Sequence, residues 1–216
     1  RYWMHNGFLN IDNRKMSKSL GNFFTVREIS EKYDLQVLRF FMLSAHYRSP
    51  LNFSAELMEA AKSGLERIII AAERLKFLMG SAKTEDMAET EAEKFAKSAE
   101  YVGNFESAMD DDFNTADAIA AVFDLVKFIN TMTDEDSSKE YLENLFDRLV
   151  RLTEVLGIIV DKEDEILDSD IEALIAERQA ARKEKNFARA DEIRDELLAK
   201  GIVLKDTREG VQWKRA

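Results

Sequence analysis

Residues 15–22 form the stretch of the sequence whose side chains are best suited to chemistry. It contains two lysines three positions apart, two serines and a closing glycine–asparagine pair: Lys15, Met16, Ser17, Lys18, Ser19, Leu20, Gly21 and Asn22. Two ammonium groups and two hydroxyls in a short loop could surround a triphosphate and stabilise the charge that develops as pyrophosphate leaves. For two lysines at an arbitrary K-x-x-K spacing, a solvated surface turn is the better explanation. The complete pentapeptide followed by Leu-Gly-Asn is far more specific and favours a nucleotide-binding loop.

Three consecutive carboxylates, Asp110, Asp111 and Asp112, suggest a metal site. Consecutive residues of a helix do not face one point, however, and Asn114 follows them as a plausible N-cap. We therefore expect these carboxylates to favour the positive end of the next helix. The sequence has no cysteine and two histidines, which excludes thiolate zinc sites, disulfides and a cysteine nucleophile. No metal ligands are predicted within the sequence.

Net charge changes sign along the chain. The 216 residues carry a formal charge of −11, which taken as a whole argues against a nucleic-acid binder. Residues 1–50 carry a net charge of +4, residues 51–170 of −17 and residues 171–216 of +2. The two ends are therefore candidates for phosphate contacts, whereas the acidic middle would repel RNA. With 45% hydrophobic residues and no apolar run of ~18 residues, the chain is expected to be globular and not membrane-spanning.

The elements that position these groups are predicted to be mainly helical, because the sequence has one proline and eight glycines. Apolar residues at i, i+3 and i+4 spacing predict helices over four segments: 57–79, 95–105, 114–129 and 142–156. Asn114 is expected to cap the third helix and Gly157 to end the fourth. Together they predict an up-and-down bundle. Residues 80–93 are predicted to be a loop or mobile linker, and residues 161–170 an acidic linker.

Short elements are predicted at both ends of this bundle. Residues 7–12 alternate like a strand that feeds the basic loop. The tail predicts a helix over 171–185, a second helix over 186–200 capped by Asn186, and a hairpin over 202–214. The predicted fold class is therefore mainly α: a helical bundle after a short strand and basic loop, with a small C-terminal helix pair and β-hairpin. The first residue is not Met and lies in an aromatic-rich stretch, which predicts a fragment of a longer protein.

These residues resemble one enzyme family. Lys15–Ser19 match the KMSKS signature of class I aminoacyl-tRNA synthetases, and the surrounding sequence resembles cysteinyl-tRNA synthetase in particular. The likeness continues through segments in every part of the chain: Tyr2–His5, Asn22–Arg27, Leu38–Phe41, His46–Ser49, Met109–Thr115, Ala181–Lys183, Ala190–Asp191 and Gly201–Leu204. It covers essentially the whole sequence.

The resemblance implies ATP- and Mg²⁺-dependent activation of cysteine to an adenylate, then transfer to the 3′ end of tRNA(Cys), by a cytoplasmic monomer. In that family the second lysine of the signature contacts ATP, which here is Lys18, and Lys15 would help to hold the loop over the phosphates. The family's HIGH-type motif and its zinc site, which selects the cysteine thiol, are implied to lie upstream of residue 1. We therefore expect the full-length protein to be an enzyme and this chain alone to be inactive.

The resemblance also implies four parts: the end of the catalytic domain (1–24), a stem-contact region (25–54), a helical bundle (55–165) and an anticodon-binding domain (171–216). The candidate contacts to the phosphates of the tRNA stem are Arg27, Arg39 and Arg48. From the residues alone, these arginines can equally be internal ion-pair partners of three nearby acids: Glu28, Glu31 or Asp34.

In the tail, Arg182, Asp191 and Asp206 match the base-reading positions of the family's anticodon-binding module, and Phe187 lies where tryptophan is common. Arginine donates in a planar fork to guanine, carboxylates accept from base amino groups, and an aromatic ring stacks on an unstacked base. The helical spacing of Phe187 instead favours a core position between the two tail helices, and Trp213 is likewise expected to pack.

Two other functions are open from the sequence. A related cysteine ligase that attaches cysteine to an amino sugar shares the KMSKS region but would not need an anticodon reader, so the tail favours the synthetase. A helical interaction module without an RNA role is the other, and its basic loop would be a relic.

Overall fold

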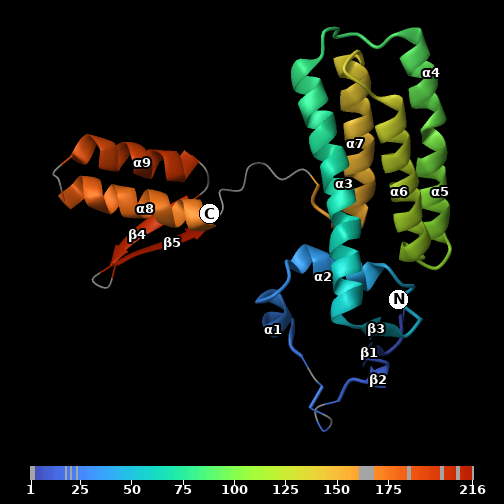
Figure 1. The fold of residues 1–216 in the computed structure, drawn as a ribbon, viewed down its shortest axis with the longest axis horizontal. Helices are drawn as coiled ribbons and strands as arrows, with labels where there is room; N and C mark the ends of the chain where they lie inside the picture. Colours follow the sequence, from blue (N-terminus) through green and yellow to red (C-terminus); the bar gives the residue numbers. More distant parts are fainter. Residues whose placement is uncertain are drawn as a thin grey trace. The chain divides into compact units, whose positions relative to one another are not determined.

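The computed structural model describes residues 3–17, 19, 21, 22, 24–160, 168–183, 186–199, 202–207 and 210–215; for 168–172, 183, 203, 205–207 and 210–215 it describes the backbone alone. The chain divides into two compact units, residues 1–161 and 162–216 (Figure 1). Helices make up most of the described chain, so the prediction of a mainly α fold is confirmed. The predicted acidic linker falls largely on residues 161–167, outside the described residues.

The first unit begins with a small sheet in the order β2-β1-β3: β1 Leu9–Ile11, β2 Arg14–Lys15 and β3 Leu51–Phe53. The hairpin β1–β2 is antiparallel, whereas β3 pairs with β1 in parallel. The segment that returns from β2 to β3 contains α1 Val26–Ser30 and α2 Leu35–Leu43. The sequence predicted the first strand but not β3, whose three residues pair with a strand some forty positions earlier.

The rest of the first unit is a bundle of long helices (Figure 1): α3 Ala55–Ser81, α4 Glu89–Lys97, α5 Ala99–Asp110, α6 Thr115–Met132 and α7 Lys139–Val155. The helices predicted over 57–79, 114–129 and 142–156 are confirmed as α3, α6 and α7. Asn114 caps α6 as expected, since its Oδ1 accepts from the amide of Asp117 at 3.2 Å. Gly157 follows the C-cap of α7 with a φ of +64°, a left-handed conformation that glycine adopts without strain.

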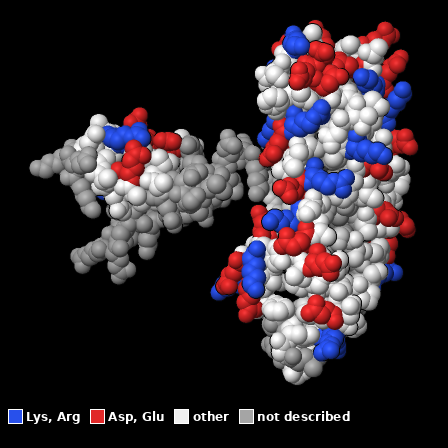
Figure 2. All heavy atoms as spheres, viewed as in Figure 1, with Lys and Arg blue, Asp and Glu red and all other residues white. Residues whose placement is uncertain are grey.

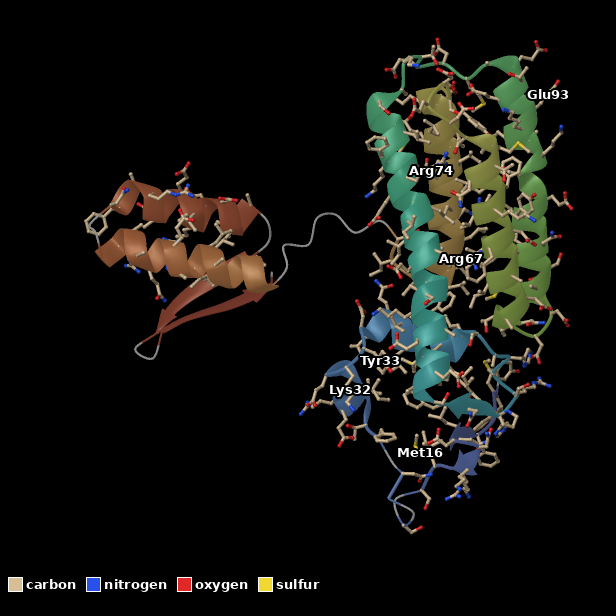
Figure 3. All side chains as sticks on the ribbon, in the orientation of Figure 1. Met16, Lys32, Tyr33, Arg67, Arg74 and Glu93 are labelled. Carbon is tan, nitrogen blue, oxygen red and sulfur yellow. The ribbon has the colours of Figure 1, made fainter. Side chains whose placement is uncertain are left out.

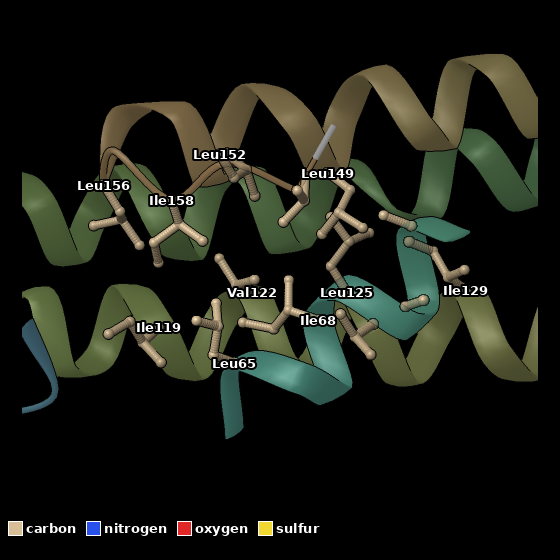
Figure 4. Packing of buried hydrophobic residues seen from close by; sticks show 14 of the residues in the cluster. Leu65, Ile68, Ile119, Val122, Leu125, Ile129, Leu149, Leu152, Leu156 and Ile158 are labelled. Carbon is tan, nitrogen blue, oxygen red and sulfur yellow. The ribbon is translucent and has the colours of Figure 1, made fainter. Parts of the chain in front are cut away.

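The core of the bundle lies where α3, α6 and α7 meet. Figure 4 shows aliphatic side chains of these helices and of the turn after α7 interleaved: Leu65, Ile68, Ile119, Val122, Leu125, Ile129, Leu149, Leu152, Leu156 and Ile158. All of them are buried. Burying one such side chain contributes roughly 1.5–3 kcal/mol, so this apolar seam is the main force that holds the helices together.

Two expectations about the bundle are wrong. Residues 80–93 are not one linker, because α3 continues to Ser81 and α4 begins at Glu89. The connection is also tied down: the carbonyls of Thr84 and Glu85 accept from the first amides of α7 at 2.9 and 3.0 Å. In addition, the helix expected over 95–105 is divided at the buried Ser98, which separates α4 from α5.

The second unit contains α8 Asp168–Lys183, α9 Phe187–Ala199, and the antiparallel hairpin of β4 Ile202–Thr207 with β5 Gly210–Arg215. This confirms the predicted helix pair and hairpin, and Asn186 accepts from the amide of Arg189 as the expected cap. Gly201, the expected end of α9, lies outside the described residues. A small apolar core holds the unit together: Ile175, Ile193, Leu197 and Ile202.

Candidate functional site

The basic signature loop begins directly at the end of the β1–β2 hairpin. Lys15 is the last residue of β2 and pairs with Asn10 of β1. The hairpin turn places Asp12 and Asn13 at φ values of 46° and 62°. Aspartate and asparagine tolerate this left-handed conformation better than most residues. The strand pairing therefore fixes where the loop leaves the sheet. Figure 3 labels Met16 in the loop that follows.

Asn22 closes the loop onto its own beginning. Its Oδ1 accepts from the amide of Ser17 at 2.9 Å, and its Nδ2 donates to the carbonyl of Lys15 at 3.2 Å. Within the loop the hydroxyls of Ser17 and Ser19 are 2.7 Å apart. Gly21 has a φ of +67°, which allows the chain to turn back. Asn22 therefore closes the loop, and the paired hydroxyls of Ser17 and Ser19 are exposed.

Of the two lysines of the loop, the structure describes only Lys15. The Nζ of Lys15 lies 5.7 Å from the centre of the Phe8 ring, on the exposed side of the hairpin, so its charge is available to a ligand. Lys18 lies outside the described residues. The predicted role of Lys18 at ATP therefore stays a prediction.

A groove of about 450 Å³ lies between α1 and the sheet. Its apolar wall includes Ile11, Phe24 and Phe53. Its polar lining has three acidic residues and one basic residue: Asp12, Glu28, Glu31, Lys32, Tyr33 and Ser54. Figure 3 labels Lys32 and Tyr33 beside α1. Because its lining carries three carboxylates and a single ammonium group, the groove does not suit a phosphate.

The three arginines predicted to contact a tRNA stem have separate environments. Arg27 is exposed on α1, and its side chain has no hydrogen-bond or ion-pair partner among the described residues. The Nε of Arg39 donates to the carbonyl of Leu156 at 2.6 Å, which satisfies the C-terminal end of α7. Arg48 pairs with Asp112 at 2.8 Å. The structure therefore gives Arg39 and Arg48 internal partners, but not the nearby acids that the sequence suggested.

The expected role of Asp112 is corrected by this pairing. Its carboxylate faces the loop after α2 instead of serving the N-terminus of α6, which Asn114 caps. A hydrogen bond with Tyr47, and next the charge of Asp112, raise the pKa of Arg48. Glu28, suggested as a partner of these arginines, instead accepts from the amide and hydroxyl of Thr25, and these two bonds lower its pKa.

Three of the four candidate base-reading residues of the tail lie where α8 ends and α9 begins. Arg182 is exposed in the last turn of α8, Phe187 is the first residue of α9, and Asp191 follows one helical turn later. Phe187 is 61% exposed, so the expectation that it packs between the tail helices is wrong. Residues four apart on a helix share a face, so Phe187 and Asp191 present a ring and a carboxylate together. Asp206 lies in β4, and the side chains of Asp206 and Trp213 lie outside the described residues.

Charges of both signs are interspersed on the visible face of the bundle (Figure 2). Acidic side chains gather at the end that carries the α3–α4 connection. Many of the basic ones are committed to neighbours: Arg74 donates to the hydroxyl and the carbonyl of Thr133, and Arg67 lies 4.9 Å from the centre of the Phe123 ring. Figure 3 shows Arg67 and Arg74 along α3. This visible face does not form a continuous basic surface.

The residues that the structure describes contain no group of histidine, cysteine or acidic side chains placed to hold a metal. A search of the same residues finds no helix long and apolar enough to cross a membrane. The chain has no cysteine and two histidines, so its residues do not fit the zinc site implied by the sequence resemblance.

Three family profiles match consecutive parts of this chain. They are described as the tRNA synthetases class I (C) catalytic domain over residues 1–63, the DALR domain over 104–160, and the cysteinyl-tRNA ligase anticodon binding domain over 164–213. Similar curated proteins are the cysteine–tRNA ligases of Lachnospira eligens, Lachnoclostridium phytofermentans and Clostridioides difficile, with identities of 65%, 54% and 52% over all of this chain. The chain belongs to the cysteine–tRNA ligase family.

This chain covers 46%, 47% and 46% of those three cysteine–tRNA ligases, so it spans about half their length. Part of this chain also has the fold of part of a larger synthetase. A leucyl enzyme of Agrobacterium radiobacter K84, solved as a ternary LeuRS–tRNA–LeuAMS complex, matches with a TM-score of 0.58 and 20% identity. The match covers 74% of this chain and 22% of that one, and at this identity it shows a likeness of fold alone.

Two residues of the site make contacts that the sequence did not predict. Asn22 was visible as an amide residue directly after Gly21, a combination typical of turns that bond their own backbone. Asp112 had no comparable signal, because its partners Tyr47 and Arg48 lie 65 and 64 positions earlier in the chain. Only the packing of the bundle against the loop after α2 brings them together.

Proposed function

We propose that the full-length protein is a cysteine–tRNA ligase that activates cysteine with ATP and transfers it to tRNA(Cys), and that this chain supplies its signature loop and tRNA-contacting parts. The observation that carries the proposal is the 65% identity to a cysteine–tRNA ligase along the whole chain. The anticodon-binding profile over residues 164–213 supports a tRNA substrate over an amino sugar, which would need no anticodon reader. It also disfavours an interaction module without an RNA role.

In this proposal the loop Lys15–Ser19 closes over ATP during activation. Lys18 contacts the triphosphate and Lys15 helps to hold the loop over it. Together they stabilise the charge that develops as pyrophosphate leaves. The bonds from Asn22 support this role because they hold the loop closed, so its hydroxyls and ammonium groups need little reorganisation to meet the phosphates. Mg²⁺ would accompany ATP as part of the substrate and neutralise the phosphate oxygens.

The proposed tRNA-stem contacts are Arg27, Arg39 and Arg48. Arg27 is the best placed of the three, because its guanidinium has no partner among the described residues and faces solvent. Arg39 and Arg48 use some of their donors internally, and their remaining N–H groups would serve the phosphates. Guanidinium contacts to phosphate set the position of the RNA without reading its sequence.

The proposed anticodon contacts are Arg182, Phe187, Asp191 and Asp206. The exposure of Phe187 supports a stacking role, since a buried ring could not meet a base. Asp191 on the same helical face would accept from the amino group of C or A, whereas Arg182 would donate to G. The assignment of the four predicted parts, the cytoplasmic location and the monomeric state belong to the same proposal.

A tRNA-binding series tests the anticodon proposal in the full-length protein. Phe187→Ala should weaken binding of tRNA(Cys) by about 5- to 150-fold, because stacking on one base contributes roughly 1–3 kcal/mol. Asp191→Ala should reduce discrimination against tRNA with a substituted anticodon. Asp195→Ala is the matched control, since it removes the same charge one turn further along α9. Binding that ignores the anticodon in the wild-type protein would overturn this reading.

Cysteine-dependent exchange of pyrophosphate into ATP tests the activity itself. We expect the full-length protein to catalyse exchange with cysteine and this 216-residue chain alone to show none. Exchange that does not depend on cysteine would refute the proposed substrate. Exchange by this chain alone would refute the view that the remaining active-site parts lie elsewhere in the protein.

A further inference from the structure

Three consecutive residues of the loop after α2 converge on one carboxylate of the bundle. The hydroxyl of Tyr47 donates to Oδ1 of Asp112 at 2.8 Å. Arg48 approaches both oxygens, with Nη2 at 3.1 Å from Oδ1 and Nε at 2.8 Å from Oδ2. The Nε2 of His46 lies 3.8 Å from Oδ2, and the His46 ring stacks on that of Tyr47. One aspartate therefore orients a whole turn of the loop.

The backbone around Asp112 holds this carboxylate in place. Asp112 and Phe113 have φ values of 57° and 55°, which reverse the chain sharply between α5 and α6. The reversal is closed by the amide of Asn114, which donates to the carbonyl of Ala108 at 3.0 Å. Both helices are packed into the bundle core. Asp112 therefore lies between two helices that are packed into the core, whereas the loop that it contacts has no regular secondary structure.

The same loop supports the strand that leads to the signature. The amide of Gly7 donates to the carbonyl of Tyr47 at 2.7 Å. Gly7 fits tightly there, because a Cβ at this position would lie 2.3 Å from the carbonyl oxygen of Ser49. Immediately afterwards the amide of Leu51 donates to the carbonyl of Phe8 at 2.9 Å, and the parallel pairing of β1 with β3 begins.

A continuous series of contacts thus joins Asp112 to the catalytic loop. It runs through Tyr47 to Gly7, along β1, and across the β1–β2 pairing to Lys15, the first residue of the signature. We propose that Asp112 is a positioning residue, which orients the loop after α2 and thereby sets the position of the Lys15–Ser19 loop. The effect on catalysis rests on the proposed function of that loop; the effect on its position does not.

Hydrogen exchange of the full-length protein tests the mechanical part directly. Asp112→Asn keeps a residue that tolerates the left-handed backbone but removes the charge, and Tyr47→Phe removes the hydroxyl alone. Both should speed the exchange of the amides of residues 9–15 by about tenfold, because the strands then open locally more often. Asp111→Asn is the control, since the exposed Asp111 side chain bonds to no described residue. Unchanged exchange in both variants overturns the proposal.

Pyrophosphate-exchange kinetics of the same variants test the catalytic part. A misplaced signature loop should raise the KM for ATP by about three- to tenfold and leave the KM for cysteine unchanged. Lowered thermal stability with unchanged KM values would show that the cluster only holds the fold together, and would overturn the catalytic role. If the wild-type protein shows no exchange with cysteine, the proposed function fails, and the hydrogen-exchange result still decides whether Asp112 positions the loop.

Discussion

Glu91 joins the first turn of α4 to the first turn of α7, and its replacement tests how much this junction stabilises the bundle. The buried carboxylate accepts three hydrogen bonds: from the hydroxyl of Ser138 at 2.6 Å, the amide of Ser138 at 2.9 Å and the amide of Ala88 at 3.0 Å. It therefore serves the N-terminal ends of two helices. Ala88 has no side-chain acceptor of its own, so no other group in the cap replaces Glu91.

The expected loss can be worked out from these bonds. A hydrogen bond to a charged group contributes about 1.5–3 kcal/mol, and a buried donor left unpaired costs about 1–3 kcal/mol. The three bonds share one carboxylate and do not add independently. Glu91→Gln keeps one carbonyl acceptor, so we expect the free energy of unfolding to fall by about 2 kcal/mol. For a chain of this size that lowers the midpoint of thermal unfolding by about 4–8 °C.

The loss should also depend on pH. Burial raises the pKa of Glu91, but the hydrogen bonds from Ser138 and Ala88 outweigh it and leave the pKa below its ordinary value. A carboxylate with a lowered folded pKa contributes stability above its unfolded pKa, and this contribution disappears as the pH falls through the folded value. Wild type and Glu91→Gln should therefore differ most near neutral pH and converge in acid.

Urea unfolding followed by helical circular dichroism measures this difference. Glu93→Gln is the matched control, because Glu93 lies on the same helix and its side chain is exposed (Figure 3). Equal unfolding free energies for Glu91→Gln and Glu93→Gln at about pH 7 would refute the reasoning. So would a Glu91→Gln deficit that stays constant down to about pH 3.

Three further changes probe the same unit. Tyr141→Phe should leave the free energy of unfolding unchanged or raise it by up to about 1 kcal/mol, because the buried hydroxyl has no partner among the described residues; a large loss in urea unfolding would contradict this. Burial, and next the charge of Glu91, raise the pKa of Tyr141 to about 12, so the variant should also lack a tyrosine ionisation near that pH in a spectrophotometric titration. Gly157→Ala should lower the melting temperature, since its φ of +64° costs a non-glycine residue about 1–2 kcal/mol and a Cβ would meet Arg39 at 2.5 Å. Gly80→Ala, which meets nothing within 4 Å in the last turn of α3, should raise it instead, and equal shifts for the two glycines would count against this account.

The helices that the sequence predicted well are those whose signals are local. The apolar period of α3, α6 and α7 spans several turns. Asn114 starts α6 and Gly157 ends α7, each through its own backbone neighbours. The connection after α3 was mispredicted because its order comes from elsewhere. Its polar sequence resembles a linker, yet Glu91 and the carbonyls that receive the first amides of α7 hold it against a helix some fifty residues later.

The candidate site likewise has parts that the sequence predicted and parts that it could not predict. The signature motif, the basic ends of the chain and the resemblance to cysteinyl-tRNA synthetase were legible in the order of residues, because a motif is itself a local arrangement of chemistry. The exposure of Phe187 was not, since the same helical spacing is compatible with a ring inside or outside the helix pair. The position of a side chain relative to a distant surface requires the packed structure.

Residue order by itself therefore determined the helical class, the loop with its lysines and serines, and the family. Tertiary structure decided which charges are available and which are committed. Arg39 donates to the carbonyl at the end of α7 and Arg48 pairs with Asp112, whereas Arg27 has no partner among the described residues. The physical reason is that charged groups pair by distance in space, and packing sets that distance between residues more than sixty positions apart in the chain.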